Sequence, residues 1–400
     1  MVQHVLVAPD KFKGSLTAAE VASHVSAGLG VPAVELPVAD GGDGTVDAAV
    51  ASGYSRITIE ATGPTGQPVS ASYAWHPTGT AVVELAEVSG LRRLPGGHAP
   101  LTATSRGTGE LIADAVRRGA KRVVLGLGGS ACTDGGAGLA QALGARLLDA
   151  DGDDLPPGGA ALKNLDRIDM SGFLDVSGVE FVVASDVDNP LLGPYGAAAV
   201  YGPQKGATPA DVAILEAGLT RFAKIAAAVA VPEPAPAAEE AASGPPGDGA
   251  TPRERPAGER LPHVARPGAG AAGGVGFAAM AFLGARIEPG IRYLLDLLRF
   301  DDLLDGASLV ITGEGSLDEQ SLRGKAPVGV AEAAARRGVP VVAVCGRRTL
   351  TDERLREAGI RAAYALTDLE PDPAVCIAEA GPLLERLAAR VAATEPELRG

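Results

Sequence analysis

The stretch that organises the chain is RVVLGLGGSACTDGGAGLAQALGARLL, residues 122–148. Its first four residues are typical of a buried strand, five of the twelve residues at 126–137 are glycine, and the apolar spacing that follows is that of a helix. A strand, a glycine-rich turn and a helix N-terminus in succession are typical of sites where backbone N–H groups bind phosphate or carboxylate. The stretch therefore predicts an α/β fold and an anion site at Gly128, Gly129, Ser130, Asp134 and Gly135.

The same stretch also allows a dinucleotide-binding interpretation. Gly126, Gly128 and Ala131 match G-x-G-x-x-A after a strand, and Asp149 follows a second candidate strand about 20 residues further on. That fingerprint needs its helix to begin inside the glycine motif, whereas the sequence TDGG at residues 133–136 favours turns and caps. We therefore rank NAD binding below simple anion binding, and an NAD-linked hydroxy-acid oxidoreductase stays an alternative.

The composition limits the partners. The chain has 400 residues, which suggests two or three domains, and a formal net charge of −14. This charge argues against nucleic acid, because neutralising its phosphates needs a basic face. Residues 268–285 carry no charge, but thirteen of these eighteen residues are Gly or Ala, which contribute little transfer free energy. We expect no membrane partner there, but a buried helix after a glycine loop that contains Gly268 and Gly270.

Three cysteines, Cys132, Cys345 and Cys376, lie far apart in the sequence. An odd number at these spacings indicates neither a disulfide framework nor a zinc site, and it favours a reducing, cytoplasmic location. The apolar run at residues 4–8 is too short for a signal peptide. The pattern leaves open whether the chain forms a homo-oligomer.

Two charged loops follow predicted strands near the N-terminus. The first strand, residues 4–8, leads into a loop with Lys11, Lys13 and Ser15, and the second, residues 33–38, leads into DGGDGT with Asp40 and Asp43. Open α/β sheets bind ligands at the carboxyl ends of their strands. The lysines and the serine are therefore candidates for phosphate binding, and the two carboxylates for Mg²⁺ or a substrate hydroxyl.

The middle of the chain has a different pattern. Apolar residues alternate at 56–87 between Gly and Pro turns, which predicts an antiparallel meander and a change of domain. Further along, polar residues that precede a predicted helix or follow a predicted strand add further candidates for anion or hydroxyl binding: Ser105, Arg106, Asp186, Asp188 and Lys205. Asp186 and Asp188 would point to the same side if the strand before them continued.

From residue 307 onward, short apolar strands alternate with helices, which predicts a parallel sheet. The loop predicted at residues 313–325 contains Glu314, Asp318 and Lys325, and this is the strongest metal-phosphate candidate in the sequence. Because the two ends of the chain share this pattern, we predict a parallel-sheet domain from residues 1–60 and 290–400 and an inserted mixed α/β domain from residues 61–289. Residues 231–262 are rich in Pro, Ala and Gly, and we expect a disordered insertion.

Eight segments resemble, in matching order, the bacterial type I glycerate kinases. They are APDKFKGSLTA (8–18), ADGGDGT (39–45), TSRGTGELI (104–112), GLGGSACTDGGAG (126–138), SDVDNPLLG (185–193), YGPQKGA (201–207), PGAGAAGG (267–274) and TGEGSLDEQSLRGKAP (312–327). The resemblance implies a two-domain α/β enzyme with one flavodoxin-like domain. It also implies transfer of the γ-phosphoryl group of ATP to D-glycerate with Mg²⁺, in bacteria generally at the 2-hydroxyl, which gives 2-phosphoglycerate.

Phosphoryl transfer needs mainly positioning and charge neutralisation. We therefore expect Lys11, Lys13 and Lys325 to neutralise anionic groups, Glu314 and Asp318 to hold Mg²⁺, and Asp186 or Asp188 to orient the hydroxyl. The glycine loops at 128–136 and 268–274 would bind anions through backbone N–H groups. A glycerate 3-kinase and a sensor that binds a sugar acid without turnover are further alternatives.

Overall fold

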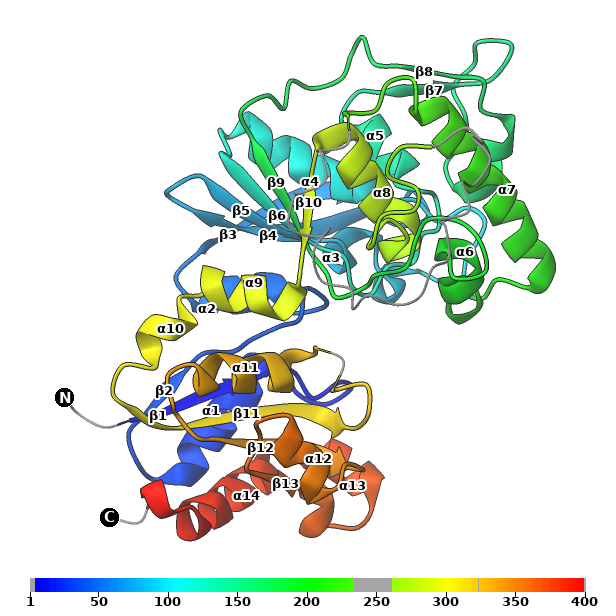
Figure 1. The fold of residues 1–400 in the computed structure, drawn as a ribbon. Coiled ribbons are helices and arrows are strands. Elements are labelled where there is room, and N and C mark those ends of the chain that lie inside the picture. The colour runs from blue at the N-terminus through cyan, green and yellow to red at the C-terminus, as the bar shows by residue number, and fades with distance from the viewer. Residues whose placement is uncertain (1–3, 233–260, 323, 399–400) are drawn as a thin grey trace, which may run out of the picture.

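The first sheet has five parallel strands taken from both ends of the chain (Figure 1). The computed structural model describes residues 4–232, 261–322 and 324–398. The strand order is β13-β12-β11-β1-β2, with β1 (His4–Pro9), β2 (Ala33–Glu35), β11 (Ala307–Leu317), β12 (Val341–Arg348) and β13 (Ala362–Ala365). Counted along the chain within this sheet, the order is the flavodoxin-like 2-1-3-4-5, which reverses direction between β1 and β11. The predicted fold class is confirmed.

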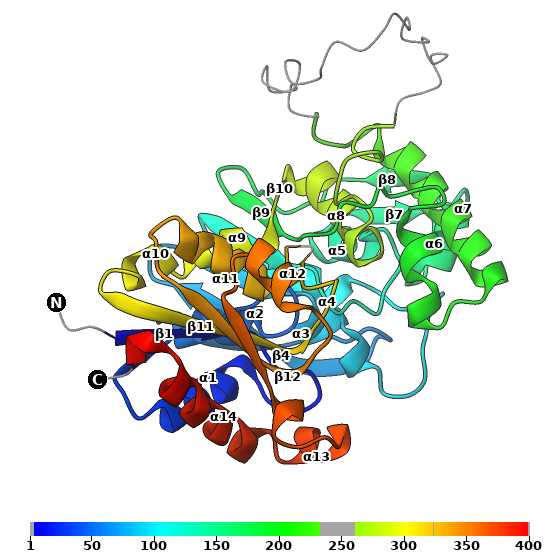
Figure 2. The same cartoon turned by 60° about the horizontal axis from the view of Figure 1, so that its bottom comes forward.

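Helices cover both faces of this sheet because its strand residues alternate in direction. Val5 and Val7 pack on one face against α1 (Ala18–Leu29) and α14 (Ala380–Thr394). Leu6 and Ala8 pack on the other face against α11 (Ala326–Ala335), with α12 (Asp352–Glu357) beside it. Figure 2 shows α1 and α14 side by side on their face of the sheet. Burial on both faces explains why these strands are almost continuously apolar.

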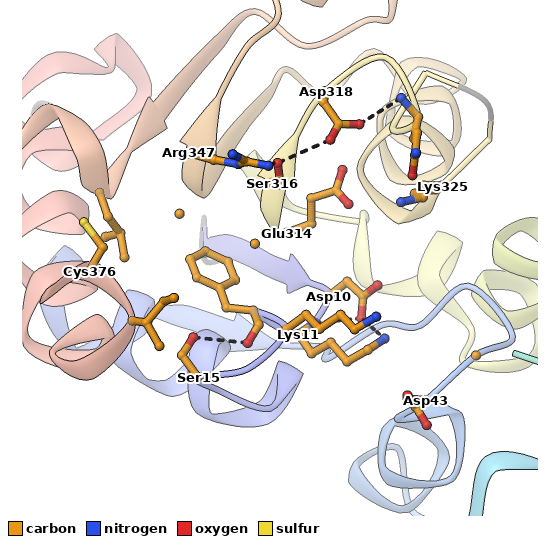
Figure 3. Close-up of a pocket in the computed structure, with 18 of the residues that line it drawn as sticks. Asp10, Lys11, Ser15, Asp43, Glu314, Ser316, Asp318, Lys325, Arg347 and Cys376 are labelled. Atoms are coloured by element: carbon orange, nitrogen blue, oxygen red, sulfur yellow. Dashed lines mark hydrogen bonds and ion pairs between the residues drawn. The ribbon is translucent and has the colours of Figure 1, made fainter. Parts of the chain in front are cut away.

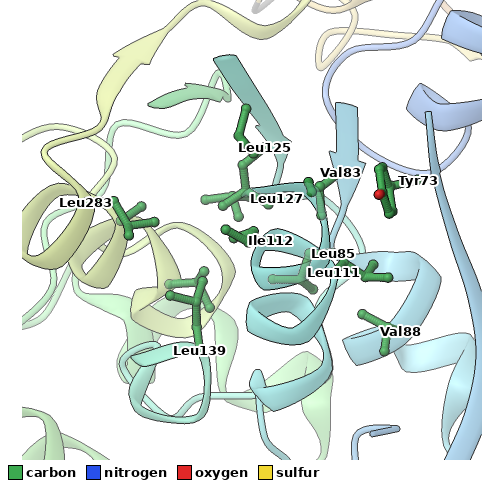
Figure 4. Packing of buried hydrophobic residues seen from close by; sticks show 14 of the residues in the cluster. Tyr73, Val83, Leu85, Val88, Leu111, Ile112, Leu125, Leu127, Leu139 and Leu283 are labelled. Atoms are coloured by element: carbon green, nitrogen blue, oxygen red, sulfur yellow. The ribbon is translucent and has the colours of Figure 1, made fainter. Parts of the chain in front are cut away.

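The second sheet has six strands in the order β10-β9-β6-β5-β4-β3. They are β3 (Ser55–Thr62), β4 (Pro68–His76), β5 (Thr80–Glu84), β6 (Arg122–Gly126), β9 (Glu180–Ala184) and β10 (Arg286–Glu288). The first three form the predicted antiparallel meander, and the rest are parallel. Leu111 and Ile112 of α4 (Arg106–Arg117) pack on one face with Tyr73 and Val83 (Figure 4). The same face also carries α3 (Ala86–Ser89), α5 (Ala137–Ala142) and α8 (Ala271–Leu283).

Two helices lie between the sheets (Figure 1). Val46 and Ala49 of α2 (Thr45–Ala51) and Leu294 of α9 (Gly290–Leu297) pack on the second sheet, while Ile291 and Leu295 of α9 face the first sheet's core. The short helix α10 (Phe300–Leu303) continues from α9 toward β11. Strand β3 crosses residue 60, where we predicted the first boundary, and pairs within the second sheet. The domain limits at residues 60 and 290 stay predictions.

The remaining elements form a cluster beside α8. They are β7 (Arg146–Leu148), β8 (Arg167–Asp169), α6 (Ala197–Tyr201), α7 (Pro209–Ala226) and short 3₁₀ turns at Gly159–Asn164 and Pro203–Lys205. Three other 3₁₀ turns lie elsewhere: Leu91–Arg93 beside α3, Leu366–Asp368 after β13 and Pro396–Leu398 after α14. Helix α8 is buried, as predicted for the glycine- and alanine-rich run. None of the helices among the described residues is long and apolar enough to cross a membrane. Most of the predicted insertion at 231–262 lies outside the described residues.

The dinucleotide-binding alternative does not fit this topology. Helix α5 begins only at Ala137, eleven residues after the last residue of β6. Strand β7, which precedes Asp149, pairs with β8 in a separate two-stranded sheet instead of lying beside β6. A Rossmann unit needs the acidic residue at the end of a neighbouring parallel strand, so Asp149 has the wrong position for binding a ribose.

Candidate active site

A cavity of about 670 Å³ lies at the carboxyl ends of the five-stranded sheet (Figure 3). Its walls come from the residues after β1 and β2, from the ends of β11 and β12, from the segment after β13, and from the turn after β6 of the other sheet. Doubly wound sheets bind ligands where the strand order reverses, and here that point lies between β1 and β11. The cavity is thus where the fold itself predicts a site.

Glycine allows the two sheets to meet beside this cavity. A Cβ atom on Gly128 would lie 2.4 Å from the Cα atom of Gly42, so the two loops could not lie this close with a side chain at position 128. A Cβ atom on Gly129 would lie 3.2 Å from Oδ1 of Asp43. The glycine-rich turn of the second sheet therefore forms one wall of a site whose charges come mainly from the first.

Lys11 is surrounded by carboxylates. Its Nζ lies 3.4 Å from Oδ1 of Asp10, whose Oδ1 also accepts a hydrogen bond of 2.6 Å from the Lys11 backbone N–H. Burial opposes the charge on Lys11, but Asp10, Asp40 and Asp43 together outweigh that effect and raise its pKa. Burial raises the pKa of Asp10 to about 6, with Lys11 acting in the opposite direction. Lys11 is therefore a fixed positive charge in an acidic cavity.

Glu314 contributes a buried and unsatisfied carboxylate. It lies on β11, because that strand runs to Leu317 and includes the first residues of the predicted loop. Burial raises the pKa of Glu314 to about 7, although Ser321 and Lys325 favour its ionised form. Oε1 of Glu314 and Oδ1 of Asp43 are both buried without a hydrogen-bond partner. Such orphaned acceptors cost free energy unless a ligand or cation satisfies them.

Glu84, at the end of β5 in the second sheet, holds the DGGDGT loop through hydrogen bonds. Its carboxylate is buried and accepts hydrogen bonds from the backbone N–H groups of Gly44 (3.0 Å) and Val46 (3.2 Å). It also pairs with Arg92 at 3.2 Å, and Nε of Arg92 lies 3.7 Å from Oδ1 of Asp43. Burial raises the pKa of Glu84 to about 7, against the lowering effects of Val46 and Arg92.

We predict that Glu84→Gln changes how stability depends on pH. A raised pKa means that folding favours protonated Glu84, so this contribution is present below the unfolded value of 4.5 and is lost as pH rises through about 7. The free energy of unfolding of the variant, relative to that of wild type, should therefore increase by on the order of 2–3 kcal/mol from pH 5 to pH 8. Urea unfolding of both proteins at pH 5 and pH 8 measures this change. If the variant and wild type differed in unfolding free energy by the same amount at both pH values, the prediction would be wrong.

Ten of the predicted site residues line the cavity. They are Lys11, Lys13, Ser15, Asp40, Asp43, Gly128, Gly129, Glu314, Asp318 and Lys325. Figure 3 shows Lys11, Glu314, Asp318 and Lys325 around one space, with Asp43 at its edge. The N-terminal loops, the glycine-rich turn and the Glu314 segment therefore line one cavity in the structure.

A second group of predicted residues has internal partners instead. Oδ2 of buried Asp134 accepts hydrogen bonds from the Ser105 backbone N–H (2.8 Å) and Oγ (2.9 Å), and its Oδ1 accepts from Gly136 N–H. Lys205 is 2% exposed, and its Nζ donates to Ser130 Oγ (2.8 Å) and the Cys132 carbonyl (2.6 Å). These hydrogen bonds hold the turn after β6 in shape, and the ligand-binding role of these residues stays a prediction.

Four other predicted residues also lie outside the cavity wall. Arg106 pairs with Glu110 at 3.2 Å within α4. Gly135 packs so closely on Phe222 that a Cβ atom would approach its ring to 2.9 Å. The Gly268 carbonyl accepts from Ala271 N–H, and Gly270 N–H donates to the Asn189 carbonyl. The backbone groups expected to bind an anion at 268–270 are thus used in the entry to α8.

The two aspartates after β9 have different positions. Asp186 lines a smaller cavity of about 210 Å³ together with residues of α9 and α11, and its Oδ1 accepts a 2.8 Å hydrogen bond from Gly290 N–H. Its surroundings, through desolvation first and the charge of Asp40 second, raise the pKa of Asp186 to about 6. Both aspartates are exposed, but Asp188 lines neither cavity. Asp186 therefore borders a cavity and Asp188 does not.

Several cavity residues were not among the predicted site residues. Asp10 is adjacent to Lys11, and Arg347 follows a predicted strand at a position equivalent to those of the recognised loops, so both had a positional signal. Arg347 donates a 3.0 Å hydrogen bond to Ser316 Oγ across β11 and β12. Leu366, Thr367, Pro373, Cys376 and Ile377 also line the cavity, and no motif marks them.

The arrangement of cations and unsatisfied carboxylates in one cavity agrees with the comparisons to known proteins. The glycerate kinase family model matches residues 5–395. The chain belongs to the glycerate kinase family. A glycerate kinase of Bacillus subtilis (strain 168) is 41% identical over 400 residues, which cover 98% of this chain and 97% of that protein. The resemblance stated from the motifs is confirmed, and the chain is a kinase.

Two further relatives agree with this assignment. The glycerate 2-kinase of Escherichia coli (strain K12) is 40% identical over 378 residues, or 90% of each chain. A solved structure from Salmonella typhimurium LT2, whose assignment as glycerate kinase 2 is provisional, has a TM-score of 0.79 and 38% identity, with 98% of both chains covered. A kinase of this family therefore has the α/β architecture described above.

Proposed function

We propose that this glycerate kinase transfers the γ-phosphoryl group of ATP to the 2-hydroxyl of D-glycerate, with Mg²⁺, in the cytoplasm. One observation carries the proposal: a single cavity receives Lys11, Lys325 and the carboxylates of Asp43 and Glu314 from separate segments of the chain. Cations and metal-binding oxygens facing one space are what phosphoryl transfer requires. The 2-hydroxyl is supported by the name of the E. coli relative, a glycerate 2-kinase.

Lys11 and Lys325 would act by binding the transferring phosphate. The attack of a hydroxyl on a phosphoryl group spreads negative charge over the phosphate oxygens, and fixed cations stabilise that charge. Lys11 lies two residues after the end of β1 and Lys325 immediately before α11, so they approach the cavity from different parts of the fold. Their placement would hold the phosphate between the strands while the backbone of Gly128 and Gly129 approaches from the other sheet.

The residues present fit Mg²⁺ bound together with a substrate. No group of three His, Cys, Asp or Glu side chains in the described ranges could hold a metal ion by itself. Mg²⁺ is usually bound by one or two carboxylates with substrate phosphates and water, so a protein-only cage is not needed. Glu314 and Asp43, each with a buried oxygen that has no hydrogen-bond partner, would hold the ion, and Asp318 and Asp40 line the same space. When bound, the ion would neutralise phosphate charge.

The decisive test is ADP release from ATP and Mg²⁺ in the presence of D-glycerate, L-glycerate and other small hydroxy acids, followed by ³¹P NMR of the product. We expect turnover with D-glycerate and a phosphorus signal coupled to the single proton on C2. Coupling to two C3 protons would instead show a 3-kinase. Glycerate binding without ADP release would favour the sensor alternative.

Asp186 and Asp188 provide a matched pair for the hydroxyl-orienting role. Asp186→Asn keeps an oxygen that can accept from Gly290 N–H but removes the charge beside Asp40. We expect kcat to fall on the order of 10²-fold for Asp186→Asn, while Asp188→Asn stays close to wild type because its side chain lies outside both cavities. A folded Asp186→Asn variant with near-normal kcat would remove Asp186 from this role.

A further inference from the structure

The cavity has one end without charge. This neutral end is formed by Leu366 and Thr367, which follow β13, and by Pro373, Cys376 and Ile377 of α13 (Pro373–Ala378). Leu366 and Cys376 are buried, whereas the Ile377 side chain is 54% exposed. The thiol of Cys376 donates to the Glu370 carbonyl at 3.1 Å, and burial raises its pKa, so it contributes an apolar surface instead of a reactive thiolate.

The rest of the cavity is ionic. Its charged lining residues are Asp10, Lys11, Lys13, Asp40, Asp43, Glu314, Asp318, Lys325 and Arg347. Two buried carboxylate oxygens without a hydrogen-bond partner, Oδ1 of Asp43 and Oε1 of Glu314, belong to this part. A three-carbon hydroxy acid has a carboxylate and two hydroxyls but no apolar group to place against Ile377. The neutral end therefore suits the other substrate, which has a flat, weakly polar end and an anionic end.

The strand order places the neutral end and the ionic part of the cavity about one nucleotide length apart. Strand β13 lies three strands away from β1 in the sheet, and neighbouring strands are about 4.8 Å apart, so their carboxyl ends are roughly 14 Å apart. This is comparable to the length of an extended nucleoside triphosphate. Figure 3 shows Cys376 on one side of the cavity and Asp43 and Lys325 on the other, with Arg347 and Ser316 between them.

Ile377 itself indicates that a ligand covers this end. Among the described residues, the exposed large hydrophobic side chains are Tyr195, Val200, Val231 and Ile377. Of these four, Ile377 is the one that lines the cavity. Covering an exposed isoleucine with an aromatic base removes apolar surface from water, which favours binding.

We propose that the neutral end binds the base of the nucleotide, and that the triphosphate runs past Arg347 and Ser316 at the ends of β12 and β11 toward Lys11 and Lys325. Glycerate then occupies the part lined by Asp40, Asp43, Gly128 and Gly129, where the two sheets meet. This assignment rests on the proposed function for the identity of the acid. The location of the base does not depend on which acid is phosphorylated.

Photolabelling of the wild-type protein with 8-azido-ATP tests the location directly and needs no turnover. Trypsin should release the neutral end as one peptide, residues 362–386, while Asp40 and Asp43 fall in residues 14–56 and Gly128 and Gly129 in residues 123–146. We expect label on 362–386 that excess ATP removes and D-glycerate does not. Label on 14–56 or 123–146 instead would overturn the inference, even if the protein proves to be a glycerate kinase.

A pair of variants on α13 separates nucleotide binding from glycerate binding. Ile377→Asp places a charge against the base, whereas Ala374→Asp places the same charge on the same helix at an exposed position outside the cavity. We expect the KM for ATP to rise about tenfold or more in Ile377→Asp, with the KM for glycerate within about twofold of wild type. Ala374→Asp should leave both unchanged. A rise confined to glycerate, or equal rises in both variants, would contradict the assignment.

Discussion

Replacing Lys11 with methionine should reduce kcat on the order of 10³-fold. The methionine keeps most of the side chain's length but removes the positive charge that lies among Asp10, Asp40 and Asp43. Two effects then add. The transferring phosphate loses a cation, and three carboxylates are left to repel both the triphosphate and the acid. Because repulsion acts before and during the transfer, the KM for ATP should also rise.

Steady-state kinetics with ATP and D-glycerate measure this effect, and a thermal melt shows whether the variant is folded. Lys163→Met is the control, because Lys163 is exposed and outside the cavity. If folded Lys11→Met kept kcat within about tenfold of wild type, Lys11 would have no major part in stabilising the transition state.

Replacing Glu314 with glutamine should reduce kcat on the order of 10²-fold and weaken the response to Mg²⁺. The pKa of Glu314 is raised to about 7 by burial, so ionisation is favoured as pH rises through 7, and the carboxylate then becomes a better ligand. We therefore expect the apparent Mg²⁺ affinity of wild type to increase between pH 6 and pH 8. In Glu314→Gln this increase should be smaller, because the carboxyl group that ionises near pH 7 is missing. Asp10, with a pKa of about 6, is already mostly ionised at pH 7 and cannot replace it.

Magnesium titrations of ADP release at pH 6, 7 and 8 measure both effects. Glu319→Gln is the matched control, because Glu319 lies five residues away, is exposed and pairs with Arg354 on the surface. Wild-type and Glu314→Gln proteins with parallel pH profiles for Mg²⁺ would argue that Glu314 does not bind the ion.

Local patterns predicted the elements and the type of chemistry well. The short apolar runs predicted the parallel sheet, and the acidic and lysine-containing loops at its strand ends do line the cavity. Strand pairing was harder to predict. Residues 313–317 look like a loop because of their glycines, yet they pair with β12, where Gly313 lies opposite Val344. A side chain on Gly313 would come within 2.4 Å of the Val344 carbonyl, so here glycine permits close strand packing instead of a turn.

Burial distinguishes two kinds of predicted site residue that look alike in the sequence. Lys205 and Asp134 are polar residues in glycine-rich segments, which is also how a ligand-binding residue looks in a sequence. Lys205 is buried against Ser130 and the Cys132 carbonyl, and Asp134 against Ser105 and glycine N–H groups. A one-dimensional pattern does not distinguish a polar group that binds a ligand from one that binds the protein's own backbone.

The amino-acid sequence by itself determined the family, the α/β class and the residue types available for phosphoryl transfer, because these depend on motifs and on the order of short segments. Only the tertiary structure decided which of the candidate loops share a cavity. That choice depends on the strand order, which places β1 beside β11 although some 300 residues separate them. It also places the unmarked residues of α13 at the far end of the same space, since β13 lies two strands beyond β11 in the sheet.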